Sequence, residues 1–240
     1  MSWFYKAIIY TQGLPDELTN ITVNGTALEK VSHFKYLGSI KSADGTCLRD
    51  VIARIAMAKK KMNQLTNIWK DRNIPNDLKL SLLKCLIWPV VMYGCEAWTL
   101  RKQEEARINA AEMWFYRRLI SVQWQDKRTN ESVLEELSTS RGLLLEINKR
   151  KMKYIGHANR NPRTNLMTTI LQGRVEGRRN RGRPPTSLMT NITANSGLTL
   201  SQVVHRSRDR QDWSTVVVAS LESDTRLDIQ ERITKFVENR

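Results

Sequence analysis

The segment 173–185 combines side chains that can bind phosphate with a backbone unsuited to regular structure. It contains five arginines and one glutamate among three glycines and two prolines, and Val175 is its one aliphatic residue. Glycine and proline exclude a regular helix or a central strand, and so few apolar side chains cannot form a core. The planar guanidinium of arginine meets phosphate oxygens bidentately. The chemistry that this segment favours is contact with a polyanion.

This segment ends a longer basic tract, residues 141–183. The tract holds twelve Lys and Arg against two Glu, a net charge of +10 in 43 residues, whereas the whole chain carries +15. Such a concentration of positive charge predicts nucleic acid as the partner, either RNA or DNA, and no small-molecule substrate. The candidate contacts in the tract are Lys149, Arg150, Lys153, His157, Arg160, Arg174, Arg178, Arg179, Arg181 and Arg183.

Three interpretations of the end of the tract stay open. Arg181-Gly182-Arg183-Pro184 equals the core of an AT-hook, in which an extended Arg-Gly-Arg lies in a narrow A·T minor groove. A sequence-neutral contact with phosphates is the second interpretation, and a solvated basic linker is the third. The four residues alone do not separate them.

Several kinds of catalytic and metal-binding motif are missing from the sequence. It has neither a Gly-rich phosphate loop followed by Lys-Ser/Thr nor a GxGxxG motif after a strand. None of the ten aspartates is adjacent to another or forms Asp-x-Asp, although two-metal phosphoryl transfer needs clustered carboxylates. The three cysteines and three histidines lack zinc-ligand spacing. We therefore predict no cofactor, no metal and no catalytic residue.

The composition predicts a folded protein in a reducing compartment. Hydrophobic residues make up 40% of the 240 residues, and no run approaches the eighteen apolar residues of a membrane span. Three cysteines cannot form a disulfide framework, and the first residues lack the arrangement of a secretory signal. We expect a nuclear or cytoplasmic location and no membrane partner.

The hydrophobic periodicity predicts a mainly α protein that begins with a β-hairpin. Residues 21–23 are a short strand, Asn24-Gly25 is a type I′ turn signal, and 28–40 is the returning strand, with a bulge or bend at Leu37-Gly38. Helices follow, and Pro89 must kink or end the second of them. The predicted helices cover 46–69, 76–87 with Asn76 as N-cap, 103–122, 130–137, 143–158, 198–213 and 224–237. In the first of these, Lys59, Lys60 and Lys61 are expected to face outward.

These elements predict five regions along the chain. An atypical N-terminal segment and a hairpin precede a helical domain, a basic Arg/Gly/Pro linker and further helices. Their ranges are 1–20, 21–45, 46–158, 159–197 and 198–240.

A series of motifs resembles the reverse transcriptase of non-LTR retrotransposons, in that family's order and approximate spacing over about residues 21–213. The motifs are Phe34-Lys35-Tyr36-Leu37-Gly38-Ser39 with Asp44-Gly45, Arg54-Ile55, Trp88-Pro89 with Tyr93-Gly94-Cys95-Glu96-Ala97-Trp98, Arg117-Arg118-Leu119-Ile120, Thr129-Asn130-Glu131, Gly156-His157-Ala158-Asn159-Arg160, and 173–185.

The resemblance implies a primer grip, a helical thumb and a basic C-terminal region. Phe34, Lys35, Tyr36, Leu37 and Gly38 would then hold a primer terminus, and the helices of 46–122, with Lys59 and Lys60, would follow the backbone of a template–primer duplex such as RNA–DNA. In the family the magnesium-binding aspartates lie upstream of this hairpin, and they have no counterpart here. The resemblance therefore suggests a truncated or fused reading frame that is not an enzyme as this chain alone.

Two other functions remain open from the sequence. The chain could be a polymerase segment that acts with a palm domain on another polypeptide. It could also be a helical structural or interaction protein whose basic charge is incidental. The sequence does not indicate an oligomeric state or a preferred strand type.

Overall fold

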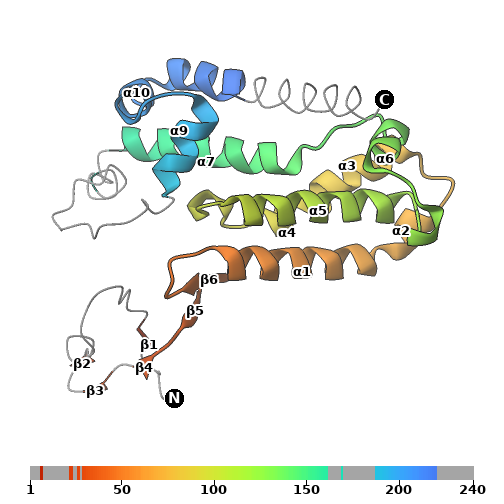
Figure 1. Cartoon of the computed structure of the whole chain (residues 1–240), viewed down its shortest axis with the longest axis horizontal. Helices are drawn as coiled ribbons and strands as arrows, with labels where there is room; N and C mark the ends of the chain where they lie inside the picture. Colours follow the sequence, from red (N-terminus) through yellow and green to blue (C-terminus); the bar gives the residue numbers. More distant parts are fainter. Residues whose placement is uncertain are drawn as a thin grey trace. The chain divides into compact units, whose positions relative to one another are not determined.

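The computed structural model describes residues 29–161 and 187–220, together with residue 169 and three two-residue strands nearer the N-terminus. The chain divides into two compact units. Figure 1 labels the helices and strands that belong to them. Unit 1 comprises Met1–Gly94 and Trp114–Lys127, and unit 2 comprises Cys95–Met113 and Arg128–Arg240. The division falls inside the range 46–158 that the sequence predicts as a helical domain.

The N-terminal strands are short and lie in separate pairs. β1 (Lys6–Ala7) pairs in parallel with β4 (Glu29–Lys30), and β2 (Thr22–Val23) pairs antiparallel with β3 (Thr26–Ala27). β2 agrees with the strand predicted over 21–23, whereas β3 lies before the returning strand predicted over 28–40. The remainder of the predicted segment 1–20 lies outside the described residues.

The main hairpin of unit 1 is β5 (His33–Tyr36) paired antiparallel with β6 (Ser39–Ser42). Leu37 and Gly38 connect these strands, with φ of 46° and 81°. The predicted single strand 28–40 with a bulge is therefore wrong in detail, because the break is a two-residue turn. Two consecutive residues in the left-handed conformation match the twist of the flanking strands. The first of them is a leucine, which rarely adopts this conformation, so the sequence gives no signal for such a turn.

The helices of unit 1 pack around one apolar core. They are α1 (Leu48–Gln64), α2 (Thr66–Lys70), α3 (Asn76–Leu86) and α4 (Trp88–Val91), followed by the last part of α5 (Lys102–Leu119) and by the 3₁₀ turn η3 (Trp124–Asp126). Both α1 and α3 contact α4. The core includes Val51, Ile55, Ala58, Met62, Trp69, Leu83, Ile87 and Val91.

Three details of unit 1 differ from the sequence prediction. The helix predicted over 46–69 is interrupted at Leu65, where the backbone leaves helical geometry and α2 begins. Pro75, in an extended conformation, occupies the N-cap position predicted for Asn76. Among the leucines of α3, Leu83 is buried, whereas Leu78 and Leu86 are exposed, so not every apolar residue of this helix faces the core. The predicted interruption near Pro89 is confirmed, since α4 carries proline in its first turn.

Unit 2 contains the first part of α5 (Lys102–Leu119) and the helices that follow Lys127. These are α6 (Asn130–Glu136), α7 (Leu143–Arg160), α9 (Leu188–Ser196), α10 (Leu200–Arg206) and a helical stretch over 210–220, and the 3₁₀ turn η2 (Cys95–Ala97) precedes them. The predicted helix 198–213 is thus two helices. The range predicted as linker contains α9, whose N-terminus is closed by a capping box of Ser187 and Thr190.

A tryptophan from the last described helix stabilises the core of unit 2. The indole Nε1 of Trp213 donates a hydrogen bond of 2.8 Å to the carbonyl oxygen of Met152 in α7. Met152, Ile155, Ile192, Val203 and Val217 are buried around it. The mainly helical fold class with an N-terminal antiparallel hairpin is confirmed. The predicted helix 224–237 lies outside the described residues.

Candidate nucleic-acid interface

The hairpin of unit 1 is attached to the first turn of α1 through one carboxylate. The Asp50 side chain accepts hydrogen bonds from the backbone N–H of Ile40, at 2.9 Å, and from the hydroxyl of Ser39, at 3.1 Å. Asp50 is buried, and its Oδ1 lies 4.0 Å from Nε of Arg54, one helical turn later. A buried, hydrogen-bonded carboxylate fixes β6 against α1 more firmly than an exposed ion pair would.

The turn at the tip of this hairpin is held by two further side chains. The hydroxyl of Tyr93 donates a hydrogen bond of 2.9 Å to the carbonyl oxygen of Leu37, and Nη2 of Arg54 donates to the carbonyl oxygen of Gly38. The Arg54 guanidinium also stacks on the Tyr93 ring, 4.2 Å from its centroid. Both turn carbonyls therefore have partners, so the conformation of the turn is set by α1 and by the segment after α4.

The predicted site residues of the hairpin gather at this fixed tip. Tyr36 and Leu37 are 58% and 75% exposed, Lys35 is exposed, and Phe34 is half-buried. Gly38 has a positive φ, and a Cβ there would lie 3.5 Å from Nη2 of Arg54. The arrangement presents an aromatic ring and an ammonium group to solvent on an ordered backbone. An exposed aromatic ring can stack on a base, and a lysine can bind a phosphate.

Only one of the two candidate lysines on α1 faces solvent fully. Lys60 is exposed, whereas Lys59 is half-buried with its ammonium 5.1 Å from the centroid of the Trp114 ring. The prediction that Lys59 faces outward is therefore wrong, because the cation is drawn over the aromatic face. The aromatic side chains differ in exposure, because Trp88 and Trp98 are buried and Trp114 is half-buried, whereas Tyr93 is exposed.

The candidate residues on α7 in unit 2 have unequal surroundings. Glu146 lies 3.5 Å from Nζ of Lys149 and 4.0 Å from Nε of Arg150, so both cations have an anionic neighbour. Lys153 and His157 are exposed and lie four residues apart, which places them on one face of the helix. These two residues are the candidates on α7 best placed to contact a polyanion.

Arg160, the last candidate on α7, makes an internal contact. Its Nη1 donates a hydrogen bond of 2.8 Å to the carbonyl oxygen of Ser207, just after α10. The neighbouring Asn159 donates to the Ser207 hydroxyl at 2.7 Å. This pair satisfies polar groups at the end of a helix, and the guanidinium has a structural partner that the sequence did not indicate.

The buried polar residues of unit 2 were not predicted from sequence. Lys151 is fully buried, and its ammonium donates a hydrogen bond of 3.0 Å to Oδ1 of Asn191 in α9. Asn191 in turn pairs with both backbone groups of Leu100, accepting from its N–H at 2.8 Å and donating to its carbonyl at 2.9 Å. The sole sequence signal is the position of Lys151, four residues after Ile147 on the buried stripe of α7.

A carboxylate from α5 closes the N-terminus of α7. Oε1 of Glu112, which is buried, accepts hydrogen bonds from the backbone N–H groups of Gly142 and Leu143 at 2.8 and 3.0 Å. These N–H groups have no partner inside the helix, and a negative charge there complements the helix dipole. A side chain thirty residues away thus performs the capping role.

None of the cysteines in the described residues forms a disulfide, and Cys95 is deeply buried. Burial, with a smaller contribution from Glu96, raises the pKa of the Cys95 thiol to about 12. In the described ranges no group of three or more His, Cys, Asp or Glu side chains is placed to hold a metal ion. The described helices also include none long and apolar enough to span a bilayer.

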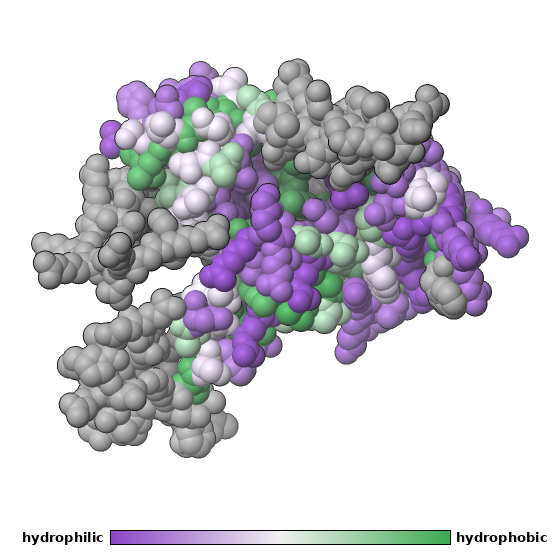
Figure 2. Space-filling view, in the orientation of Figure 1, coloured by the Kyte–Doolittle hydropathy of each residue, from purple (hydrophilic) through white to green (hydrophobic). Residues whose placement is uncertain are grey.

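The visible face of the molecule is mainly hydrophilic where the structure describes it (Figure 2). Apolar side chains reach the surface between the polar ones, and the exposed ones of unit 1 include Leu37, Ile52 and Met57. The remaining predicted contacts, Arg174, Arg178, Arg179, Arg181 and Arg183, lie outside the described residues.

Comparison with known proteins relates the chain to mobile genetic elements. It is 25% identical over 202 residues to an uncharacterized transposon-derived protein of Caenorhabditis elegans, and the match covers 80% of this chain and 72% of the relative. No protein-family model matches the sequence. No solved structure matches it either. The relationship supports a transposon-related origin for this chain.

Proposed function

We propose that the protein binds nucleic acid, RNA or DNA, and derives from the C-terminal part of a non-LTR retrotransposon reverse transcriptase. The hairpin β5–β6 would be its primer-grip element, and the helices of unit 1 its thumb. The transposon-derived relative supports the origin, and the series of motifs supports the kind of element. The observation that carries the proposal is the hairpin tip, whose two carbonyls are held by Tyr93 and Arg54 while Tyr36 stays exposed.

The fixed tip favours binding for an energetic reason. A loop that is already ordered loses less conformational entropy when it binds a ligand. Tyr36 can stack on a base or on a terminal nucleoside, a contact typically worth about 1–3 kcal/mol. Lys35 on the hairpin and Lys60 on α1 supply positive charge within the same unit. An exposed aromatic ring beside a lysine on an ordered hairpin suits a single strand or a strand end.

We further propose that these 240 residues alone neither polymerise nor cleave nucleic acid. Two-metal phosphoryl transfer needs clustered carboxylates, and the sequence holds no adjacent or alternating aspartates. The measurement is magnesium-dependent extension of a DNA primer on an RNA template by the purified chain. No extension is expected. Extension that persists after removal of contaminating polymerases would contradict this part of the proposal.

The binding experiment measures the affinity of the full chain for a primer–template duplex across a range of salt concentrations. We expect log K to fall steeply with log salt, by about 0.9 per neutralised phosphate. Tyr36→Ala should weaken binding about tenfold, as the loss of one stacking contact predicts. His33→Ala, an exposed residue on the same strand, is the control and should change little.

A second set of variants tests the tract. Replacing Arg178, Arg179, Arg181 and Arg183 by Ala should reduce the magnitude of the salt slope by up to about 4 and weaken all sequences alike. The charge-matched control replaces four exposed residues of the described part, Arg49, Arg72, Arg208 and Arg210. A selective loss of A·T-rich binding would favour the AT-hook interpretation. Absence of salt-dependent binding by the unaltered chain would leave a helical interaction protein as the function.

A further inference from the structure

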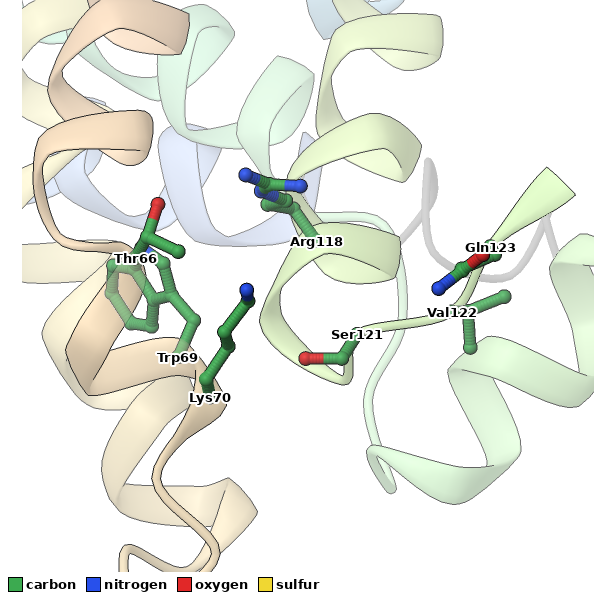
Figure 3. Close-up of a pocket in the computed structure, with 7 residues that line it drawn as sticks. All are labelled: Thr66, Trp69, Lys70, Arg118, Ser121, Val122 and Gln123. Carbon is green, nitrogen blue, oxygen red and sulfur yellow. The ribbon is translucent and has the colours of Figure 1, made fainter.

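A small pocket opens in unit 1 between α2 and the end of α5. It has a volume of about 220 Å³, and its walls are Thr66, Trp69, Lys70, Arg118, Ser121, Val122 and Gln123. Figure 3 shows the side chains of Lys70, Arg118 and Ser121 extending toward the space between the two segments. The volume is several times the about 30 Å³ that a water molecule takes up in the liquid, so a small polyatomic ion fits.

The charge of this pocket is one-sided. Lys70 and Arg118 each contribute a positive charge, and none of the seven lining residues is acidic. No salt bridge within the described ranges joins either cation to a carboxylate. The pocket therefore favours an anion with several oxygen acceptors.

The floor of the pocket is rigid. The Trp69 indole donates a hydrogen bond of 2.8 Å to the carbonyl oxygen of Met62, and the carbonyl of Trp69 accepts one of 2.9 Å from the ammonium of Lys79. Lys79 is buried, so a third cation lies behind the floor in a medium of low dielectric constant. Fixed walls and a positive field lower the cost of binding an anion.

The walls also exclude a base as the ligand. Trp69 is only 2% exposed, so its ring offers no free face for stacking. The groups that remain available are the two cations, the Ser121 hydroxyl and the Gln123 amide, all of which can donate hydrogen bonds. Three of these donors, on Lys70, Arg118 and Ser121, extend toward one space, whereas Gln123 lies apart from them (Figure 3). Such donors match the oxygens of a phosphate group rather than a planar ring.

We infer that the pocket formed by Lys70, Arg118 and Ser121 binds a phosphate group. The assignment of that phosphate to a nucleic acid, as an internal phosphodiester or as a strand-terminal phosphate, rests on the function proposed above. The binding of the phosphate group itself rests only on the pocket. Lys70 and Arg118 would neutralise the anion, and Ser121 would donate to one of its oxygens.

The first test uses inorganic phosphate as the probe and no nucleic acid. The full chain is titrated with sodium phosphate, and with sodium chloride at matched ionic strength, while backbone amide signals are followed by NMR. Phosphate should shift the signals of Ser121, Val122 and Gln123 saturably, and chloride should not. Lys70→Gln and Arg118→Gln should each weaken phosphate affinity about tenfold, the usual effect of losing one charge-assisted hydrogen bond. Equal shifts with both salts, or no saturation, would overturn the inference.

Matched variants separate the pocket from general surface charge. Lys61→Gln and Arg72→Gln remove one exposed cation each from the same unit without touching the pocket lining. Phosphate affinity should stay within twofold of the unaltered chain. A loss as large as that of the pocket variants would show a diffuse charge effect and would contradict the inference. Thermal unfolding of each variant confirms that the fold is retained.

The second test identifies the source of the phosphate. Oligonucleotides of one sequence are compared with a 5′-phosphate and with a 5′-hydroxyl. A strand-terminal site predicts that Lys70→Gln weakens only the phosphorylated strand, whereas an internal site predicts equal weakening of both. If inorganic phosphate binds and neither oligonucleotide does, the pocket inference holds and the proposed function fails. If the oligonucleotides bind but the pocket variants change neither them nor phosphate, the inference fails and the proposed function stands.

Discussion

The two units use buried polar contacts for different purposes. In unit 1, buried Asp50 and Arg54 hold a hairpin so that its tip faces solvent. In unit 2, buried Lys151 and Glu112 join helices to one another and face no solvent. Both sets consist of charged residues that the sequence alone would place at a surface. A charged residue in the sequence therefore does not by itself indicate a binding surface. Its contacts decide whether it supports an exposed turn or joins helices inside a core.

The contacts in unit 2 also show that fewer cations of the basic tract, 141–183, are available for binding than its net charge indicates. Its described members include Lys151, which is buried, Arg160, which donates to a carbonyl, and Lys149 and Arg150, which lie beside Glu146. The net charge of 141–183 therefore overstates how many of its cations are available to a polyanion. Unit 1 has 16 Lys and Arg against 8 Asp and Glu, a net charge of +8, whereas unit 2 has 23 against 16, a net charge of +7. Unit 1 also holds both the fixed hairpin tip and the pocket with two cations.

The largest expected effect is on the core of unit 2. A Cβ at position 156 would lie 2.3 Å from Cδ1 of Trp213, so Gly156→Ala should destabilise the fold by about 3 kcal/mol. His157→Ala, next to it but exposed, should change stability by less than about 0.5 kcal/mol. Urea unfolding of both variants measures the difference. Equal stabilities would mean that packing against Trp213 does not require glycine at position 156.

The next effect concerns the hairpin of unit 1. Asp50→Ala leaves the N–H of Ile40 without its carboxylate acceptor and should cost about 2 kcal/mol. Because the hairpin loses its attachment, nucleic-acid affinity should fall as well. Asp50→Asn keeps one carbonyl acceptor and should cost less. If Asp50→Ala destabilised the protein but left its affinity for nucleic acid unchanged, the fixed hairpin tip would have no role in binding. The proposed difference between the two units would then be wrong.

The smallest effect distinguishes a structural arginine from a binding one. Arg160→Gln removes the hydrogen bond to the Ser207 carbonyl and should lower stability by about 1 kcal/mol. The slope of log K against log salt should not change, because this guanidinium contacts protein rather than phosphate. Lys153→Gln is the matched control on the same helix. It should leave stability unchanged and reduce the magnitude of the salt slope. A smaller salt slope in the Arg160 variant would show that Arg160 contacts phosphate and belongs to the binding surface.

The helices were predictable to the extent that apolar spacing determines them. Periodic apolar residues gave α3, α5, α6 and α7 nearly within their bounds. α9 was not predicted, because it is rich in residues of low helix propensity. Its sequence is Leu-Met-Thr-Asn-Ile-Thr-Ala-Asn-Ser. Burial of Met189 and Ile192, together with the capping box at Ser187, outweighs those preferences.

The candidate site was only partly predictable. Residues 34–38 stood out by motif, but the contacts that fix them did not. Arg54 reaches Gly38 across 16 residues, and Tyr93 reaches Leu37 across 56. Local pattern cannot state which distant side chain will meet a turn carbonyl, because that depends on helix packing. The pocket of Lys70 and Arg118 escaped for the same reason, since its two cations lie on segments far apart in the sequence.

The contacts of Asn191 have a consequence for how the chain folds. Residues 100 and 191 are joined by two hydrogen bonds, and residues 152 and 213 by a third, so the interior of unit 2 closes long loops. Loop closure of this kind cannot occur until the later residues have left the ribosome, which slows completion of the unit. The same contacts bridge the interval 162–186. A chain cut once within that interval should therefore stay assembled as two fragments that co-purify without a covalent link.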